Sequence, residues 1–443
     1  MTHFHTRGPF VLPQRASFMS FDLRRWVSRH CGGTFVSFLG WVDHDAEQQD
    51  SILRALGAAK GHDARDELGL GTIRDSFADL FFPGLSTIQQ RVRYFLFVQW
   101  CCEIAARQGD ADRIVARLHD AEVRLIKALS HLGEGAGVIG ILSQEDLERM
   151  PSEIYWNGLM VLGMRRTSGS RQRWSRQVAA NRASGKYEAL EEEGIVSSHD
   201  VGFDPGRPSP PDGFLQQEVD FTLRADEADF LRARLKNACI DQTGRGHEYN
   251  LFGTFSRYRR KTLVRAAWEH PKVADLRPSA RDLLMLGAAF SRIMYGAVIL
   301  YNVCVSRLLE GRENATQILD NHLASFGVWA DTLNPADVDL LTRRISELSL
   351  FGSMTRHRID EKAIAFVTRW TRYCQEPSKI LGDQAANRLV SDREVFLKSA
   401  GGTSRIRSQK ARERWGGESG GAMDYRWFTA RSCLNDLAAP ANA

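Results

Sequence analysis

The sequence predicts a mainly α-helical protein of many helices, with minor β content. Apolar residues recur at three- and four-residue spacing on both sides of residues 165–212, which is the period of amphipathic helices. Strand-like patterns occur only at 35–39 and 218–223, so few strands are expected. Three long segments consist mostly of strong helix formers, at 279–310, 334–350 and 359–374.

Residues 165–212 divide the chain into two expected helical lobes. Seven basic residues and no acidic one occur from Arg165 to Lys186, and residues 204–213 are rich in Pro and Gly. This composition is typical of a linker. The predicted organisation is an irregular N-terminal extension at 1–33, a helical domain at 34–164, a basic and then acidic, Pro-rich linker at 165–212, and a C-terminal helical domain at 213–443.

Capping residues and helix breakers set the expected helix ends in residues 34–164. Asp, Ser and Thr side chains accept hydrogen bonds at helix N-termini, and Pro-Gly pairs end helices. Within the helix expected at 88–106, the segment 94–104 is apolar on most faces, so this helix is expected to be central. The expected helices are one capped by Asp43, one from Thr72 to Pro83-Gly84, then 88–106, 109–132, a short one after Ser143 and one from Pro151.

In residues 213–443, a first helix is expected to begin at Thr222 or Asp226, and a last helix at 424–437. A basic, glycine-rich segment at 399–421 interrupts the helical pattern between the segments named above and this last helix. Glycine and clustered charge both disfavour a packed helix interior. The second lobe is therefore predicted to be helical up to about residue 398 and again after 424.

The apolar run Leu283–Val305 is long enough to cross a membrane, but its polar residues oppose that interpretation. Arg292 lies near its middle and Asn302 near its end. A central arginine costs about 2.5–3.5 kcal/mol on membrane insertion. The run is therefore predicted to be a buried core helix, and no membrane contact is expected.

Composition excludes several classes of protein. Apolar residues make up 43% and charged residues 26% of the chain, which is normal for a globular protein. The seven cysteines form no C-x-x-C pair, so neither a disulfide framework nor a zinc site is expected, and a reducing, cytoplasmic location fits. The first residues lack the continuous apolar segment of a secretory signal. The net charge of +5 is too small by itself to indicate a polyanion partner.

The glycine-rich segment at 133–140 does not predict a cofactor. Gly135, Gly137 and Gly140 fit the G-x-G-x-x-G spacing. A dinucleotide site also needs a preceding strand and an acidic residue about 20 positions later, whereas a helix is expected before this loop. The histidines form no ligand cluster in the sequence. No cofactor and no metal are therefore predicted.

A charged block at residues 65–93 leaves two interpretations open. Its carboxylates, Asp66, Glu67 and Asp75, could act as acid and base or form an enzyme site of unfamiliar type. Its arginines, Arg74, Arg91 and Arg93, could hold an anion beside the start of a helix. The alternative is an internal network of ion pairs, for which the planar guanidinium is well suited, with Arg91 and Arg93 paired to Asp66, Glu67 or Asp75.

Three basic stretches that contain aromatic residues indicate contact with nucleic acid. Cations grip the phosphate backbone and aromatic rings stack on bases. The alternative for each stretch is a solvated loop. The candidate contact residues are Arg171, Arg173, Trp174 and Arg176 in the first stretch, Arg257, Arg259, Arg260 and Lys261 in the second, and Arg405 and Arg407 in the third.

The chain contains a series of distinctive motifs: Arg65-Asp66-Glu67-Leu68-Gly69, Gly71-Thr72-Ile73-Arg74-Asp75, Leu80-Phe81-Phe82-Pro83-Gly84, Ser86-Thr87-Ile88-Gln89, Arg93-Tyr94-Phe95-Leu96-Phe97 and Pro151-Ser152-Glu153-Ile154-Tyr155-Trp156. These motifs resemble an uncharacterised bacterial family that is catalogued only as a domain of unknown function. The resemblance covers about residue 35 to the C-terminus and is most specific at 62–100. It implies no activity, cofactor or site residue, but it implies occurrence in variable bacterial regions where antiphage systems collect.

Three functions remain open on the sequence alone. The first is a component of a defence-type bacterial system that binds nucleic acid or other proteins of a multi-gene system. The second is an enzyme built on the charged block at 65–93. The third is a purely structural interaction protein.

Overall fold

The computed structural model describes residues 66–438 except 108, 134, 142–146, 148, 185–200, 241–244 and 399–402. All of these residues belong to one compact unit. Four expected features lie outside the described residues: the extension at 1–33, the strand at 35–39, the helix capped by Asp43 and the start of the helix after Ser143.

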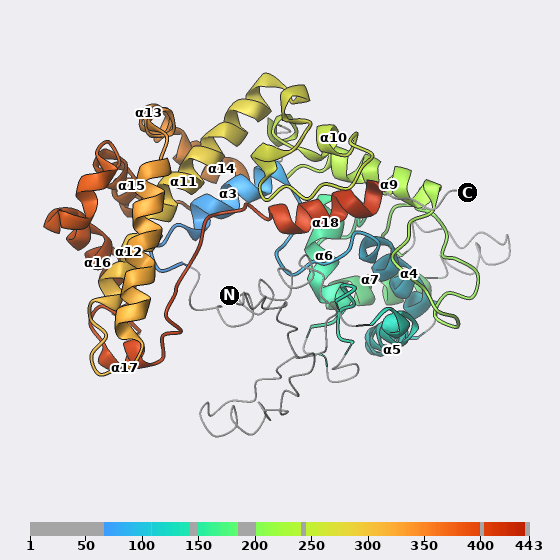
Figure 1. The fold of residues 1–443 in the computed structure, drawn as a ribbon. Coiled ribbons are helices and arrows are strands. Elements are labelled where there is room, and N and C mark those ends of the chain that lie inside the picture. The colour runs from blue at the N-terminus through green and yellow to red at the C-terminus, as the bar shows by residue number, and fades with distance from the viewer. Residues whose placement is uncertain are drawn as a thin grey trace, which may run out of the picture. The chain divides into compact units, whose positions relative to one another are not determined.

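The described residues are mainly helical, as predicted, and no strand occurs among them (Figure 1). The α-helices of the first part are α3 (Gly71–Phe81), α4 (Tyr94–Ala106), α5 (Ala111–Leu129), α6 (Pro151–Val161), α7 (Arg171–Ala183), α9 (Ala225–Asn237) and α10 (Phe252–Phe255). Those that follow are α11 (Pro278–Ser306), α12 (Ala315–Thr332), α13 (Pro335–Arg344), α14 (Glu347–Thr355), α15 (Glu361–Tyr373), α16 (Gln384–Lys398), α17 (Gln409–Glu413) and α18 (Trp427–Ala438). Short 3-10 helices are η1 (Ser130–Leu132), η3 (Arg245–Glu248), η4 (Ala267–Glu269), η5 (Val273–Asp275) and η6 (Pro377–Gly382).

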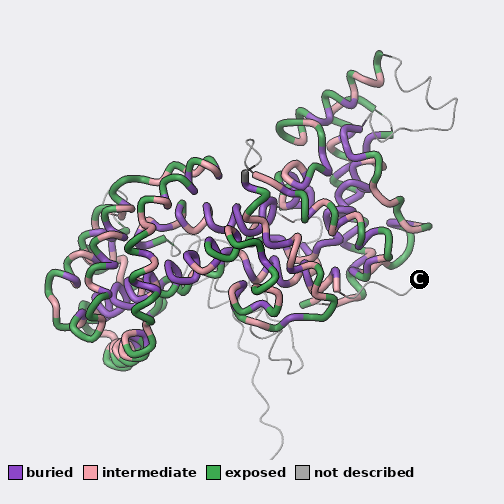
Figure 2. The backbone as a smooth tube through the Cα atoms, turned by 90° about the horizontal axis from the view of Figure 1, so that it is seen from above, coloured by how far each residue is buried: buried purple, intermediate pink, exposed green. Residues whose placement is uncertain are grey.

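Two groups of helices surround the two most apolar segments. Helix α4 contacts α5, α6 and α7, whereas α11 contacts α12, α13, α15 and α16. Buried residues run through the middle of both groups (Figure 2). Buried side chains from both sides of 165–212 belong to one hydrophobic cluster. The division into separate lobes stays a prediction.

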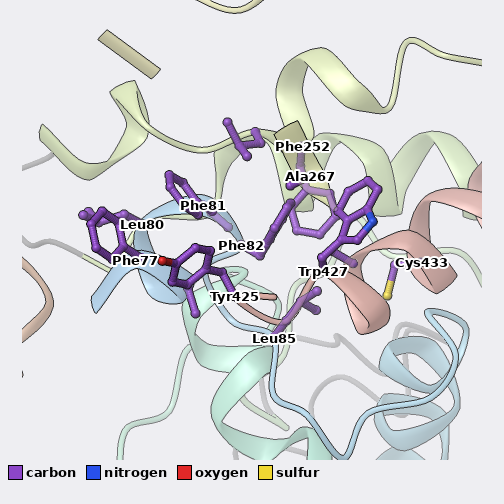
Figure 3. Packing of buried hydrophobic residues seen from close by; sticks show 14 of the residues in the cluster. Phe77, Leu80, Phe81, Phe82, Leu85, Phe252, Ala267, Tyr425, Trp427 and Cys433 are labelled. Atoms are coloured by element: carbon purple, nitrogen blue, oxygen red, sulfur yellow. The ribbon is translucent and has the colours of Figure 1, made fainter. Parts of the chain in front are cut away.

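Aromatic side chains of α3 connect segments that are far apart in the sequence. The ring of Phe77 lies 5.8 Å from Phe290 of α11, 5.8 Å from Phe351 of α14 and 5.2 Å from Tyr425, between ring centroids. Phe82, the residue directly after α3, packs with its ring centroid 5.9 Å from that of Trp427 (Figure 3). The apolar spacing of α3 therefore places its buried face at the junction of several helices.

Helix α7 lies within residues 165–212, where a linker without a helix was predicted. The Ser170 side chain caps this helix by accepting a hydrogen bond from the Arg173 backbone nitrogen at 3.2 Å. Trp174 and Val178, one turn apart, are both buried, and α7 contacts α5. Two large apolar residues one turn apart thus dock a helix whose other residues are polar or alanine.

The prediction of a strand at 218–223 is wrong, because these residues form no strand. Val219 donates its backbone N–H to the Ala128 carbonyl at the end of α5, at 3.1 Å. Asp220 then turns the chain, because its carboxylate accepts from the Thr222 backbone nitrogen at 2.8 Å. The only bridge of β type among the described residues is an isolated one between Arg165 and Phe203. The apolar residue Phe221 packs on Tyr94 instead.

The predicted core helix at Leu283–Val305 is confirmed as part of α11. This helix is long and apolar enough to cross a membrane, yet 78% of its apolar window is buried inside the protein. Arg292 pairs with Asp337 at 2.7 Å, and Asn302 exchanges two hydrogen bonds with the Ser419 backbone at 3.0 and 3.1 Å. Both polar residues therefore have hydrogen-bonding partners in neighbouring segments.

We expect the Phe77→Ala substitution to lower the free energy of unfolding by about 3–5 kcal/mol, because it leaves a cavity between the rings of Phe290, Phe351 and Tyr425. Urea unfolding followed by circular dichroism measures the change. Thr72→Ala on the exposed face of the same helix is the matched control and should cost under about 0.5 kcal/mol. A similar small change in both variants would show that α3 does not carry the junction.

Candidate functional site

Asp66 acts as a cap for α3. Its carboxylate accepts hydrogen bonds from the backbone nitrogens of Leu70 and Gly71, the latter at 2.9 Å. A carboxylate at this position satisfies helix N–H groups and complements the positive end of the helix dipole. The structure thus gives this candidate catalytic residue a local role that accounts for its position.

Arg74 and Asp75 form a partly exposed ion pair on the outer face of α3. Their side chains are 3.0 Å apart and each is about one-third exposed. Burial opposes the charge of Arg74, but the hydrogen bond to Asp75 and the nearby carboxylates of Asp66 and Asp424 outweigh it and raise the pKa of the guanidinium. Arg74 is therefore surrounded by negative charge and is poorly suited to hold an anion.

A buried charge cluster lies on the next turn of α3 and was not predicted. Asp79 accepts a hydrogen bond from His357 Nε2 at 2.8 Å and pairs with Arg426. Arg426 also donates to the Leu85 carbonyl at 2.8 Å and lies 3.8 Å from Asp75. His357 and Arg426 are 69 positions apart in the numbering and far from α3, so no local pattern could have joined them to Asp79.

The backbone at Tyr425 and Arg426 is strained, because both residues have positive φ, 53° and 64°. Residues other than glycine rarely adopt this left-handed region of backbone conformation. The conformation is held by the bonds of Arg426 and by the Tyr425 hydroxyl, which donates to the Gly287 carbonyl at 2.6 Å. Strain of this kind persists only where surrounding contacts over-determine it.

Glu67 points away from the other two candidate carboxylates. Its side chain is 5% exposed and pairs with Arg405, while Lys398 lies 3.7 Å away. Arg405 also donates to the Tyr301 hydroxyl at 3.3 Å. The three carboxylates Asp66, Glu67 and Asp75 therefore serve a helix cap, an internal ion pair and a surface ion pair. They do not converge on one reacting position.

Arg91 and Arg93 have carboxylate partners, but not the expected ones. Arg91 makes a two-pronged contact with Asp436 of α18, at 3.1 and 2.8 Å. Arg93 reaches the fully buried Glu227 at 2.8 Å and Asp220 at 3.3 Å. The alternative that paired Arg91 and Arg93 with Asp66, Glu67 or Asp75 is wrong. The fold instead places the carboxylates of α18 and α9 next to these two arginines. Both arginines of the anion site considered at 86–94 are therefore already paired with carboxylates.

The first basic stretch is divided between interior and surface. The Arg165 guanidinium lies 4.4 Å from the centre of the Trp156 ring, and Arg171 pairs with Glu153. Trp174 is fully buried and donates to the Val201 carbonyl at 2.6 Å, so its ring faces are not open to a base. The exposed cations in the described part of this stretch are Arg166, Arg173 and Arg176.

All four cations of the second basic stretch lie at the surface. Arg257, Arg259, Arg260 and Lys261 are all exposed, and within the described part of the chain none of the four makes an ion pair. We call these four residues the 257–261 basic surface. Of the three stretches, this one keeps every predicted cation available.

The third basic stretch again mixes both roles. Arg405 belongs to the internal pair with Glu67, whereas Arg407 is exposed. Trp415 is buried, and its ring nitrogen donates to the Ser419 hydroxyl at 2.8 Å. The structure therefore does not bring all the predicted contact residues to the surface.

A family model described as "Family of unknown function (DUF6361)" matches residues 36–441. The chain belongs to this family. The predicted resemblance to a domain of unknown function is confirmed over almost the same residues. Among curated proteins and among solved structures, none matches this DUF6361 chain. Its function therefore has to be argued from the arrangement of its own side chains.

We expect Arg91→Ala to lower the free energy of unfolding by about 3–5 kcal/mol, because it leaves the buried Asp436 carboxylate without its partner. The side chain of Asp436 is 7% exposed in the intact pair. Arg113→Ala is the matched control, since its pair with Asp110 is at the surface, 75% and 66% exposed, and should cost at most about 1 kcal/mol. Equal losses in urea unfolding would contradict a structural role for Arg91.

We expect His357→Ala to destabilise the protein more at about pH 6 than at about pH 9, on either side of the ordinary histidine pKa of about 6.5. The hydrogen bond to Asp79 raises the pKa of His357 in the folded protein. Its stabilisation is complete below the unfolded pKa and is lost as pH rises through the folded pKa.

The measurement for His357 is urea unfolding of the wild-type and variant proteins at both pH values. His247, which is exposed, provides the control, and His247→Ala should give the same small change at each pH. A loss for His357→Ala that does not depend on pH would show that the proton of His357 contributes nothing to the Asp79 contact.

Proposed function

We propose that this DUF6361 chain is a cytoplasmic, nucleic-acid-binding component of a multi-protein bacterial defence-type system. The observation that supports binding is the 257–261 basic surface: four exposed cations within five consecutive positions, none of which makes an ion pair with a described residue. The bacterial defence context rests on the family resemblance. The thiols of Cys101, Cys102, Cys304 and Cys374 are buried and unbridged, which supports a reducing compartment.

The segment that carries these cations is anchored at both ends. On its N-terminal side, the buried Phe255 stacks on His270 with ring centroids 4.0 Å apart. On its C-terminal side, Thr262 exchanges two hydrogen bonds with the Asn435 side chain, at 2.8 and 3.1 Å. The backbone between these anchors is short, so little conformational entropy remains to be lost on binding.

Arg232 of helix α9 lies near this segment, because burial and then the charge of Arg259 lower its pKa. Arg232 is paired with Asp229 at 2.7 Å, so its charge is already compensated. The four cations of the 257–261 basic surface, in contrast, make no ion pair with a described residue.

Measuring the affinity of the full chain for DNA at about 50 and about 200 mM salt tests the proposal. Four phosphate contacts predict that affinity falls by about a hundredfold over this range. A variant with Arg257, Arg259, Arg260 and Lys261 all changed to Ala should lose most of this affinity and most of its salt dependence.

The matched control removes four exposed arginines elsewhere, Arg281, Arg343, Arg369 and Arg372, and therefore makes the same change in net charge. It should bind nearly as the wild-type protein does. If the wild-type protein shows no salt-dependent binding, or if both variants bind equally, the nucleic-acid proposal fails. A structural interaction protein is then the better description.

An enzyme built on Asp66, Glu67 and Asp75 has less support. Geometry comes first for an acid–base pair, since both groups must reach one substrate. Glu67 is directed to Arg405, whereas Asp66 is engaged at the start of α3. Arg93 is likewise held by Glu227.

A further inference from the structure

We infer that the 257–261 basic surface binds the phosphate backbone of a nucleic-acid duplex and does not stack on unpaired bases. This inference rests on the proposed function and names the form of its ligand. Single-strand binders combine a basic groove with aromatic rings that stack on successive bases. Duplex binders that do not read sequence need only the cations. The position of the aromatic residues therefore separates the two.

The aromatic residues of the three basic stretches offer no fully exposed ring. Trp174 has no exposed surface, and Trp415 is 3% exposed and stacks against His322. Tyr258, between Arg257 and Arg259, is half-buried, with its ring centroid 5.5 Å from the buried His270. The four cations of the 257–261 basic surface are therefore exposed, whereas the one ring between them packs on His270.

The nearest large apolar side chain at the surface is not aromatic. Leu263 is 64% exposed and lies two positions after Lys261. An aliphatic side chain offers no ring face to a base. Phe396 of α16 is the aromatic residue found among the large exposed apolar side chains of the described chain, and Lys362 covers its ring at 4.4 Å. Neither residue provides a stacking platform beside Arg257, Arg259 and Arg260.

Charge density then favours the duplex. A DNA duplex carries one negative charge per about 1.7 Å of its axis, and cations released on binding give a steeper salt dependence than for a single strand. Four neighbouring cations on an anchored segment therefore gain more binding free energy from a duplex than from a single strand. Without stacking to compensate, a single strand should be the weaker ligand, and base sequence should matter little.

The test compares the full chain binding to a duplex of about 20 base pairs, or two helical turns, with its binding to one of the two strands. We expect at least about tenfold tighter binding to the duplex at about 100 mM salt, a slope of log affinity against log salt of about −4, and similar affinity for unrelated duplex sequences. Tyr258→Leu keeps an apolar contact with His270 and should leave both affinities within about twofold.

Two results would overturn this inference while leaving the proposed function intact. One is a single strand bound as tightly as the duplex. The other is a Tyr258→Leu variant that loses about tenfold in single-strand affinity while circular dichroism shows it folded. If the quadruple alanine variant of the 257–261 basic surface binds the duplex as well as the wild-type protein does, the proposed function and this inference both fail.

Discussion

Arg426 joins α3 to the last part of the described chain, and the surrounding structure depends on this contact. Its guanidinium holds Asp79 and the Leu85 carbonyl, while its own backbone is kept at positive φ. Directly before it, Tyr425 packs against Phe77. The charged contact and the aromatic junction therefore fix the same turn from two sides. Loss of either would expose a buried carboxylate or open the core.

The same pairing recurs along the chain. Glu67 meets Arg405, Asp79 meets Arg426, and Arg91 meets Asp436, so residues 66–91 are joined in order to residues 405–436. A buried charge is tolerated only when it is paired and hydrogen-bonded. Each pair thus requires both segments to be folded, which makes the first and last described parts of this DUF6361 chain interdependent.

Arginine in this protein serves two separate purposes, which its abundance in the sequence does not reveal. Some arginines are internal partners of carboxylates, such as Arg93 with Glu227. Others, such as Arg257 and Arg260, are displayed to solvent without an ion-pair partner in the described residues. Only the second kind is available to a polyanion, and this distinction moves the functional hypothesis from the charged block at 65–93 to the segment at 257–261.

The sequence by itself determined the fold class, the family and the helices with a clear apolar period. Helices α3, α5, α6, α11 and α15 lie close to where capping and spacing predicted them. Helix α4 begins at Tyr94 rather than 88, because turns at 86–93 position Arg91 and Arg93 for distant partners. The bounds of helices α12 and α16 were not predicted. Helix α12 buries only His322, Phe326 and Trp329, although many of its residues are apolar, and two of the four residues that α16 buries are charged.

Only the tertiary structure decided which charges are used internally. Nothing local distinguishes Arg405 from Arg407, yet one is held by Glu67 and the other faces solvent. The partner of Asp79, His357, lies 278 positions away. Ion pairs of this kind depend on where whole helices meet, whereas periodicity and capping depend on neighbours within a turn or two. Local patterns therefore predicted the helices, whereas long-range packing decided which charged residues are paired inside the protein and which are available at its surface.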